Sequence, residues 1–381
     1  MKSTSGSHFI ALDHVRALAA FMVFTWHFIH GESQPVPGHA PAIFPLALLD
    51  QGHTGVALFM ALSGYLFAKL LDGKSINYKS FLWNRILRLV PLLVVVVIVD
   101  EIVFGGGNGG NFFSYAYYYA CFIARSAILP ILPNGGWSIT VEFHYYAILP
   151  LFLWMIRKSK WMPISIIVVA IALRSLIYLQ RGELRSLAYW TIIGRIDQFA
   201  LGMLIFQFRN FMARRHAIAI LIMVGFAMFY WYLDFLGGFF DMPEPIWIIL
   251  PTVEGLAYAI AIAWYDNSFV HSTAGVSRFI GRIGEYSYSI YLFHAFVVFK
   301  MATLINEHVI DTSNFYVACV MSAVCFLLMM PPGYLSFRFI EAPFLKLRKP
   351  YVIPLRSNEE MWPQVVLQPE QVERPKCLPE L

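Results

Sequence analysis

Long apolar runs separated by short polar segments dominate the chain from residue 9 to residue 333. A helix needs roughly 20 mostly apolar residues to cross the hydrocarbon core of a bilayer. The stretches that meet this length are residues 9–30, 53–71, 88–104, 138–156, 161–179, 190–208, 216–235, 246–265, 285–305 and 314–333. The pattern predicts an all-α, polytopic membrane protein with about ten transmembrane helices.

The basic residues between these stretches indicate how the chain is oriented, because cytoplasmic loops are rich in Lys and Arg. A further apolar stretch, 112–133, decides the count. If it is a re-entrant or surface segment on the outer side, Lys and Arg are missing from the outer loops 31–52, 105–111, 236–245 and 306–313, and loop 180–189 is the exception. If it crosses fully, every later loop inverts and the asymmetry is lost. We therefore predict cytoplasmic N- and C-termini and a multi-pass protein of the inner (plasma) membrane.

Composition supports the membrane assignment. Hydrophobic residues make up 59% of the chain and charged residues 13%, whereas soluble domains carry about 25% charged residues. The four cysteines lack the spacing of a disulfide framework or a metal site. From residue 346 prolines alternate with charges, which is typical of a disordered segment. We predict a membrane domain over 1–345 and a disordered cytoplasmic tail over 346–381.

Ionisable side chains inside a membrane span are costly and by default suggest function. Arg16 and His27 lie eleven residues apart in the first stretch. At about 100° per residue they share one helix face, roughly 16 Å apart along the axis. We predict Arg16 at the cytoplasmic end and His27 near the outer end. The pair on one face favours function over the alternative of a snorkelling Arg and an interfacial His.

A second polar group begins the third stretch, where Arg85 and Arg88 project from one side at the cytoplasmic start. Guanidinium clusters suit phosphate, although a positive-inside anchor is the better explanation of the pair taken alone. Glu142 follows Trp137 near the outer start of the fourth stretch, at a depth that we expect to match that of His27. A carboxylate beside the imidazole would fix its tautomer and raise its basicity. The alternative is a structural Glu paired with an Arg.

Three further groups are weaker candidates. Arg195 and Asp197 are interpreted as a structural ion pair, and Arg338 and Glu341 as an anchoring ion pair beside the last helix. His294 is a lone intramembrane histidine that we expect to serve packing.

Seven segments over residues 10–345 resemble, in order, the membrane acyltransferase family 3. LDHVRALAAFMVFTWH resembles the family's first-helix motif, an Arg followed by its essential His. NRILRLVP resembles the RxxR segment, and GGWSITVEFHYYAILP the W-S-x-x-x-E-F motif. The other segments are GHTGVALFMALSGYLF, GRIDQFALGM, GEYSYSIYLFH and SFRFIEAPF. Each motif alone is a weak signal, and their order across the membrane domain makes the resemblance strong.

The resemblance implies an integral-membrane O-acyltransferase. Such an enzyme moves an acyl group, usually acetyl, from cytoplasmic acyl-CoA to a hydroxyl of a carbohydrate acceptor such as a cell-surface polysaccharide or lipo-oligosaccharide. It implies His27 and Glu142 as catalytic residues, with His27 as base or nucleophile, and Arg16, Arg85 and Arg88 as the residues that bind the co-substrate acetyl-CoA. We expect the form without a fused SGNH domain, with room for a separate glycan-synthesis or acyl-relay partner.

The expected partners are the lipid bilayer and a carbohydrate acceptor. We expect the protein to bind no metal and no nucleic acid. The residues alone also allow a transporter of a lipid-linked or small solute, because intramembrane His, Arg and Glu serve coupling equally well. A purely structural membrane subunit of a glycan-synthesis complex is a third possibility. Replacing His27 would leave such a subunit's phenotype intact.

Overall fold

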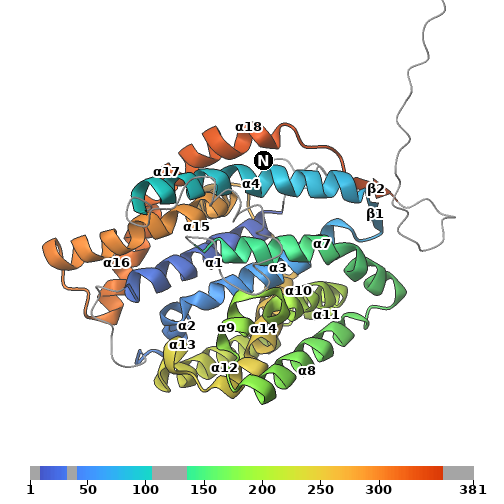
Figure 1. Ribbon diagram of the computed structural model, residues 1–381, viewed down its shortest axis with the longest axis horizontal. Helices are drawn as coiled ribbons and strands as arrows, with labels where there is room; N and C mark the ends of the chain where they lie inside the picture. The colour runs from blue at the N-terminus through green and yellow to red at the C-terminus, as the bar shows by residue number, and fades with distance from the viewer. Residues whose placement is uncertain (1–8, 32–40, 105–134, 355–381) are drawn as a thin grey trace, which may run out of the picture.

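The computed structural model describes residues 9–31, 41–104 and 135–354, which form a helical bundle (Figure 1). The helices are α1 (Ile10–Ile29), α2 (Ala47–Asp50), α3 (Gly55–Leu70), α4 (Tyr78–Phe104), α7 (Trp137–Lys158), α8 (Pro163–Arg181), α9 (Arg185–Trp190), α10 (Ile192–Gln207), α11 (Arg209–Met212), α12 (His216–Phe235), α13 (Gly238–Asp241), α14 (Leu250–Ser268), α15 (Gly275–His308), α16 (Phe315–Leu328), α17 (Met330–Ser336) and α18 (Ala342–Leu345). A π-helical turn, Phe337–Glu341, joins the last two.

The predicted all-α membrane fold is confirmed, and each predicted stretch overlaps a helix. Among the described residues, 7 helical segments are long and apolar enough to cross a membrane. Helices α1, α10 and α14 fall outside that set because they are shorter or more polar. They are also interior helices, so their polar groups face protein. The total of about ten spans and the side on which the termini lie remain predictions, and the stretch 112–133 lies outside the described residues.

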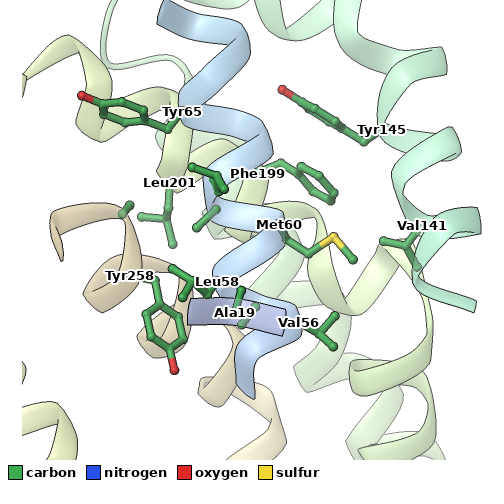
Figure 2. Close-up of a cluster of buried hydrophobic side chains, with 14 of the residues drawn as sticks. Ala19, Val56, Leu58, Met60, Tyr65, Val141, Tyr145, Phe199, Leu201 and Tyr258 are labelled. Atoms are coloured by element: carbon green, nitrogen blue, oxygen red, sulfur yellow. The ribbon is translucent and has the colours of Figure 1, made fainter. Parts of the chain in front are cut away.

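The interior helices approach one another closely. Helix α1 packs against α15 and α3, and α3 packs against α10 and α14 (Figure 1). Apolar side chains from α1, α3, α7, α10 and α14 meet around α3 in one core (Figure 2). Glycines allow the backbones to touch: a Cβ on Gly64 would lie 2.1 Å from the carbonyl oxygen of Phe199, and one on Gly284 would lie 1.9 Å from that of Asp13. Small residues at such crossings are typical of membrane helix packing.

We expect Gly284→Ala to destabilise the protein, because the new methyl group meets backbone that cannot rotate away. Overpacking of this kind costs about 1–3 kcal/mol or more. The measurement is the thermal unfolding midpoint of the purified protein in detergent. Gly225→Ala in α12 is the matched control, since a Cβ at Gly225 meets nothing within 4 Å. It should leave the midpoint unchanged or raise it, because Ala is the better helix former. Equal midpoints for both variants would contradict the close crossing of α1 and α15.

Two buried ion pairs join α8, α10 and α14, and they differ from the predicted pairing of Arg195 with Asp197. Arg174 Nη2 lies 2.6 Å from Asp197 Oδ2, and Arg195 Nη1 lies 3.0 Å from Glu254 Oε2. Residues two apart on a helix point to different sides, so each finds its counter-charge on a neighbouring helix. Removing one partner from such a pair would leave an uncompensated buried charge. We assign these groups to the structure of the bundle.

The predicted anchoring pair of Arg338 and Glu341 is also not formed. Arg338 Nη1 donates to the hydroxyl of Tyr334 at 2.8 Å, whereas Ser289 Oγ donates to Glu341 Oε1 at 2.5 Å. Glu341 is buried and belongs to the interface between the π-helical turn and α15.

The chain remains ordered beyond the predicted domain boundary at 345. Strand β2 (Val352–Pro354) pairs antiparallel with β1 (Lys74–Ile76), the short strand between α3 and α4. Asn84 of α4 donates from Nδ2 to the carbonyl oxygen of Lys349 at 2.6 Å and accepts from the Lys349 amide at 2.9 Å. We call residues 346–354 the C-terminal strap. The predicted tail is therefore wrong over the strap, and its remainder, 355–381, lies outside the described residues.

Candidate active site

A cavity of about 210 Å³ lies between α1, α3, α4, α7, α15 and the C-terminal strap. We call the end of the bundle where α1 begins and α3 ends the arginine end, and the end where α1 finishes and α3 begins the histidine end. The polar residues that line the cavity are Asp13, Arg16, Ser63, Arg85, Arg88, Ser138, Glu142, Tyr146, Glu285, Ser287, Tyr288, Tyr291, Arg348 and Tyr351. About half of its apolar lining comes from α3.

The structure brings the predicted arginines Arg16, Arg85 and Arg88 together in this cavity. Arg16 is partly exposed, and its Nη1 donates to Asp13 Oδ1 one turn earlier. Arg88 lies close enough to Arg16 and Arg85 for electrostatic repulsion between the three side chains. Like charges repel, so this grouping favours a ligand that carries several negative charges.

Aromatic rings hold Arg85 in place. Its guanidinium carbon lies 5.5 Å from the ring centroids of Phe67 and Phe81, 5.8 Å from that of Tyr146 and 6.0 Å from that of Tyr351. Ring faces attract cations, so this cage supports a charged side chain away from bulk water. Nε of Arg85 is nevertheless buried without a hydrogen-bond partner among the described residues.

Glu142 lies in the same cavity and not beside His27. Its Oε1 accepts a hydrogen bond from the hydroxyl of Tyr146, and Ser63 Oγ donates to the same oxygen at 3.3 Å. The carboxylate also interacts with Arg85 through its charge. The predicted partnership of Glu142 with the His27 imidazole is therefore not formed. Instead, the carboxylate offsets part of the positive charge of the arginines.

The register between helices explains this difference. Helix α3 runs antiparallel to α1: a Cβ on Gly55 would lie 2.6 Å from the carbonyl oxygen of Ala19, and Nζ of Lys69 lies 4.4 Å from the Phe9 ring. Ser63 is therefore level with the first half of α1, and Glu142, which Ser63 contacts, is level with it too. The sequence shows where Glu142 lies on α7 but not how far α7 is shifted along α1.

His27 lies at the histidine end, outside the cavity lining. Its Nδ1 is 2.8 Å from the carbonyl oxygen of Val23 and 3.3 Å from Nε2 of His294. The two imidazole centroids are 4.8 Å apart. His294, which the sequence suggested as a packing residue, is thus an ionisable neighbour of His27.

The hydrogen bonds of this histidine pair define one tautomer for each ring. Nδ1 of His294 bonds the carbonyl oxygen of Tyr291, and Nδ1 of His27 bonds that of Val23. A carbonyl only accepts, so both Nδ1 atoms carry the proton when the rings are neutral. Nε2 of His294 can then accept from His27 Nδ1–H. Nε2 of His27 is left with a free lone pair, the form that a general base or a nucleophile requires.

Tyr291 connects the cavity to the histidine pair. It lines the cavity, and its hydroxyl accepts a hydrogen bond from Ser138 Oγ at 2.9 Å. Its ring centroid is 5.7 Å from that of His294. A ligand that follows the cavity from the arginine end towards Tyr291 therefore approaches the two imidazoles.

Comparison with known proteins identifies the family of the chain. The model of the acyltransferase 3 family, an acyltransferase domain, matches residues 9–331. The chain belongs to this family. No curated protein and no solved structure matches the chain. The matched segment of this acyltransferase contains all five predicted site residues, whereas the C-terminal strap follows it.

The sequence analysis undervalued two residues that the structure places at or beside the candidate site, His294 and Arg348. His294 carried a usable signal, since an intramembrane ionisable side chain suggests function by default. Arg348 carried none, because it falls in a segment whose composition indicated disorder. Among the described residues, no group of three or more His, Cys, Asp or Glu side chains is arranged to hold a metal ion.

Proposed function

We propose that this membrane acyltransferase moves an acyl group, acetyl in the first instance, from acyl-CoA to a hydroxyl of a carbohydrate such as a cell-surface polysaccharide or lipo-oligosaccharide. The observation that carries the proposal is the cavity that groups Arg16, Arg85 and Arg88 at one end and leads towards the histidine pair. Coenzyme A is a polyanion with a long, thin thiol arm. Its phosphates suit the guanidinium groups. Its thiol arm suits the apolar side chains of α3 that line the cavity.

In this proposal the arginine end faces the cytoplasm, where acyl-CoA is found. The loops that the sequence assigns to the cytoplasm carry the excess of Lys and Arg that the positive-inside rule requires. The thioester then lies near Tyr291, and the acceptor hydroxyl approaches His27 from the histidine end.

The proposed chemistry requires one proton carrier. Nε2 of His27 takes the proton of the acceptor hydroxyl as its oxygen attacks the thioester carbonyl carbon. The new C–O bond forms, the C–S bond breaks, and the leaving CoA thiolate receives the proton. The same lone pair also permits direct attack by His27, which would form an acyl-imidazole before transfer. Glu142 balances the arginines and orients Tyr146 in the donor site, rather than orienting His27.

The test is CoA release from labelled acetyl-CoA by the purified protein in lipid nanodiscs, with and without a panel of glycan acceptors. We expect binding of acetyl-CoA, slow CoA release alone and faster release with the correct acceptor, with label appearing in the glycan. Label retained on the protein would identify the acyl-imidazole route. Failure to bind any acyl-CoA, together with solute movement that follows a proton gradient, would favour the transporter alternative.

A further inference from the structure

Arg348 of the C-terminal strap lines the same cavity as Arg85 and Arg88. Its Nε and Nη2 atoms are buried and have no hydrogen-bond partner among the described residues. A guanidinium group has five donors and normally uses them when it is buried. Nε carries one of these donors and Nη2 two, and leaving three of the five unsatisfied costs free energy that a structural role does not repay.

Backbone contacts of the C-terminal strap position the Arg348 side chain. The two hydrogen bonds between Asn84 and Lys349 hold the residue next to Arg348, and the amide of Asn77 donates to the carbonyl oxygen of Tyr351 at 2.8 Å. Tyr351, three residues on, is buried and completes the aromatic cage of Arg85. The backbone is therefore fixed directly after Arg348, so the placement of its side chain in the cavity does not depend on an ion pair.

The charges around Arg348 are predominantly positive. Burial, Arg88 and Arg85 lower the pKa of its guanidinium to about 9, against the opposing effects of Tyr351 and Glu341. Glu341 is already bonded to Ser289. An arginine that is made less basic by its neighbours gains the most from an added anion, because the anion offsets desolvation and repulsion together.

We propose that Arg348 is a fourth anion-binding residue of the cavity, which binds a phosphate group of the acyl-CoA, and that the C-terminal strap is part of the donor site. This inference rests on the proposed function for the identity of the anion. It assigns a binding residue to a segment beyond the part of the chain that the family model matches.

The test compares Arg348→Gln with Arg348→Lys and with Lys346→Gln, a matched control that removes one positive charge from an exposed position of the same strap. Acetyl-CoA and inorganic pyrophosphate are the probes, and the dissociation constant is measured for the full chain in nanodiscs at several salt concentrations. A charge-assisted hydrogen bond corresponds to a loss of about 10- to 100-fold in affinity. We expect that loss for both probes in Arg348→Gln, a partial rescue in Arg348→Lys, and wild-type affinity in Lys346→Gln.

Salt dependence separates a binding role from a structural one. Loss of one ionic contact flattens the dependence of the dissociation constant on salt, so Arg348→Gln should show a shallower slope than wild type and Lys346→Gln should not. Wild-type affinity for acetyl-CoA in Arg348→Gln would overturn the inference and leave the proposed function intact. A loss of affinity with an unchanged salt slope and no rescue by lysine would also overturn it. Arg348-dependent binding of pyrophosphate without binding of acetyl-CoA would support the anion site and contradict the acyl-CoA donor.

Discussion

We expect the replacement of His27 by alanine to lower acyl transfer by about 10²- to 10⁴-fold, the range for loss of a general acid–base group, while acetyl-CoA still binds. The reason that binding should survive is the position of His27. His27 does not line the cavity that groups the arginines, so its removal leaves the phosphate contacts unchanged. It does remove the lone pair on Nε2, which the hydrogen bond of Nδ1 to Val23 keeps available. The measurements are the rate of label transfer to the glycan and the dissociation constant for acetyl-CoA.

His294→Asn is the matched comparison for this first prediction. Asparagine keeps a polar group near Nδ1 of His27 but removes the second imidazole, which lies 3.3 Å away. We expect a smaller loss of rate, of about 10-fold, because the Val23 carbonyl still orients His27. If His27→Ala retained wild-type transfer, or lost acetyl-CoA binding as fully as it lost rate, the base or nucleophile would have to lie elsewhere.

The second large effect is expected from the double variant Arg85→Gln, Arg88→Gln. Each arginine would contribute one charge-assisted contact to phosphate, and each such contact is worth about 1.5–3 kcal/mol. Together they correspond to a loss of affinity for acetyl-CoA of about 10²- to 10⁴-fold. At saturating donor, the rate of transfer should fall much less, because the histidine pair is intact. Titration of acetyl-CoA binding and the KM for acetyl-CoA measure these two effects separately.

Arg209→Gln is the control for the second prediction. Arg209 begins α11, and its Nη2 lies 2.9 Å from Oδ2 of Asp72 in an exposed ion pair outside the cavity. Exposed ion pairs contribute about 0–1 kcal/mol, so this variant removes one guanidinium without touching the site. The unfolding midpoint of every variant is measured as well, because Arg85 is packed among aromatic rings. A well-folded double variant with wild-type affinity would show that the arginines anchor the helices and bind no donor.

From the sequence alone one could predict the helical class, the approximate place of the long helices along the chain and the location of Arg16, Arg85 and Arg88 at a common end of the bundle. These follow from the length of apolar runs and from charge placement, which act within single segments. Helix periodicity also placed Arg16 and His27 on one face of α1. Membership of the acyltransferase 3 family agrees with the motifs that the sequence displays.

Only the tertiary structure decided which side chains meet between helices. It placed Glu142 beside Ser63 rather than beside His27, supplied His294 as the neighbour of His27, and paired Arg195 with Glu254. It also brought Arg348 into the cavity. The physical reason is that an apolar pattern specifies which face of a helix is buried. The pattern does not specify how far the helix is shifted along the axis of the neighbouring helix. That shift depends on the packing of glycines and large side chains at each crossing, and a shift of one turn, about 5.4 Å, exchanges every polar contact.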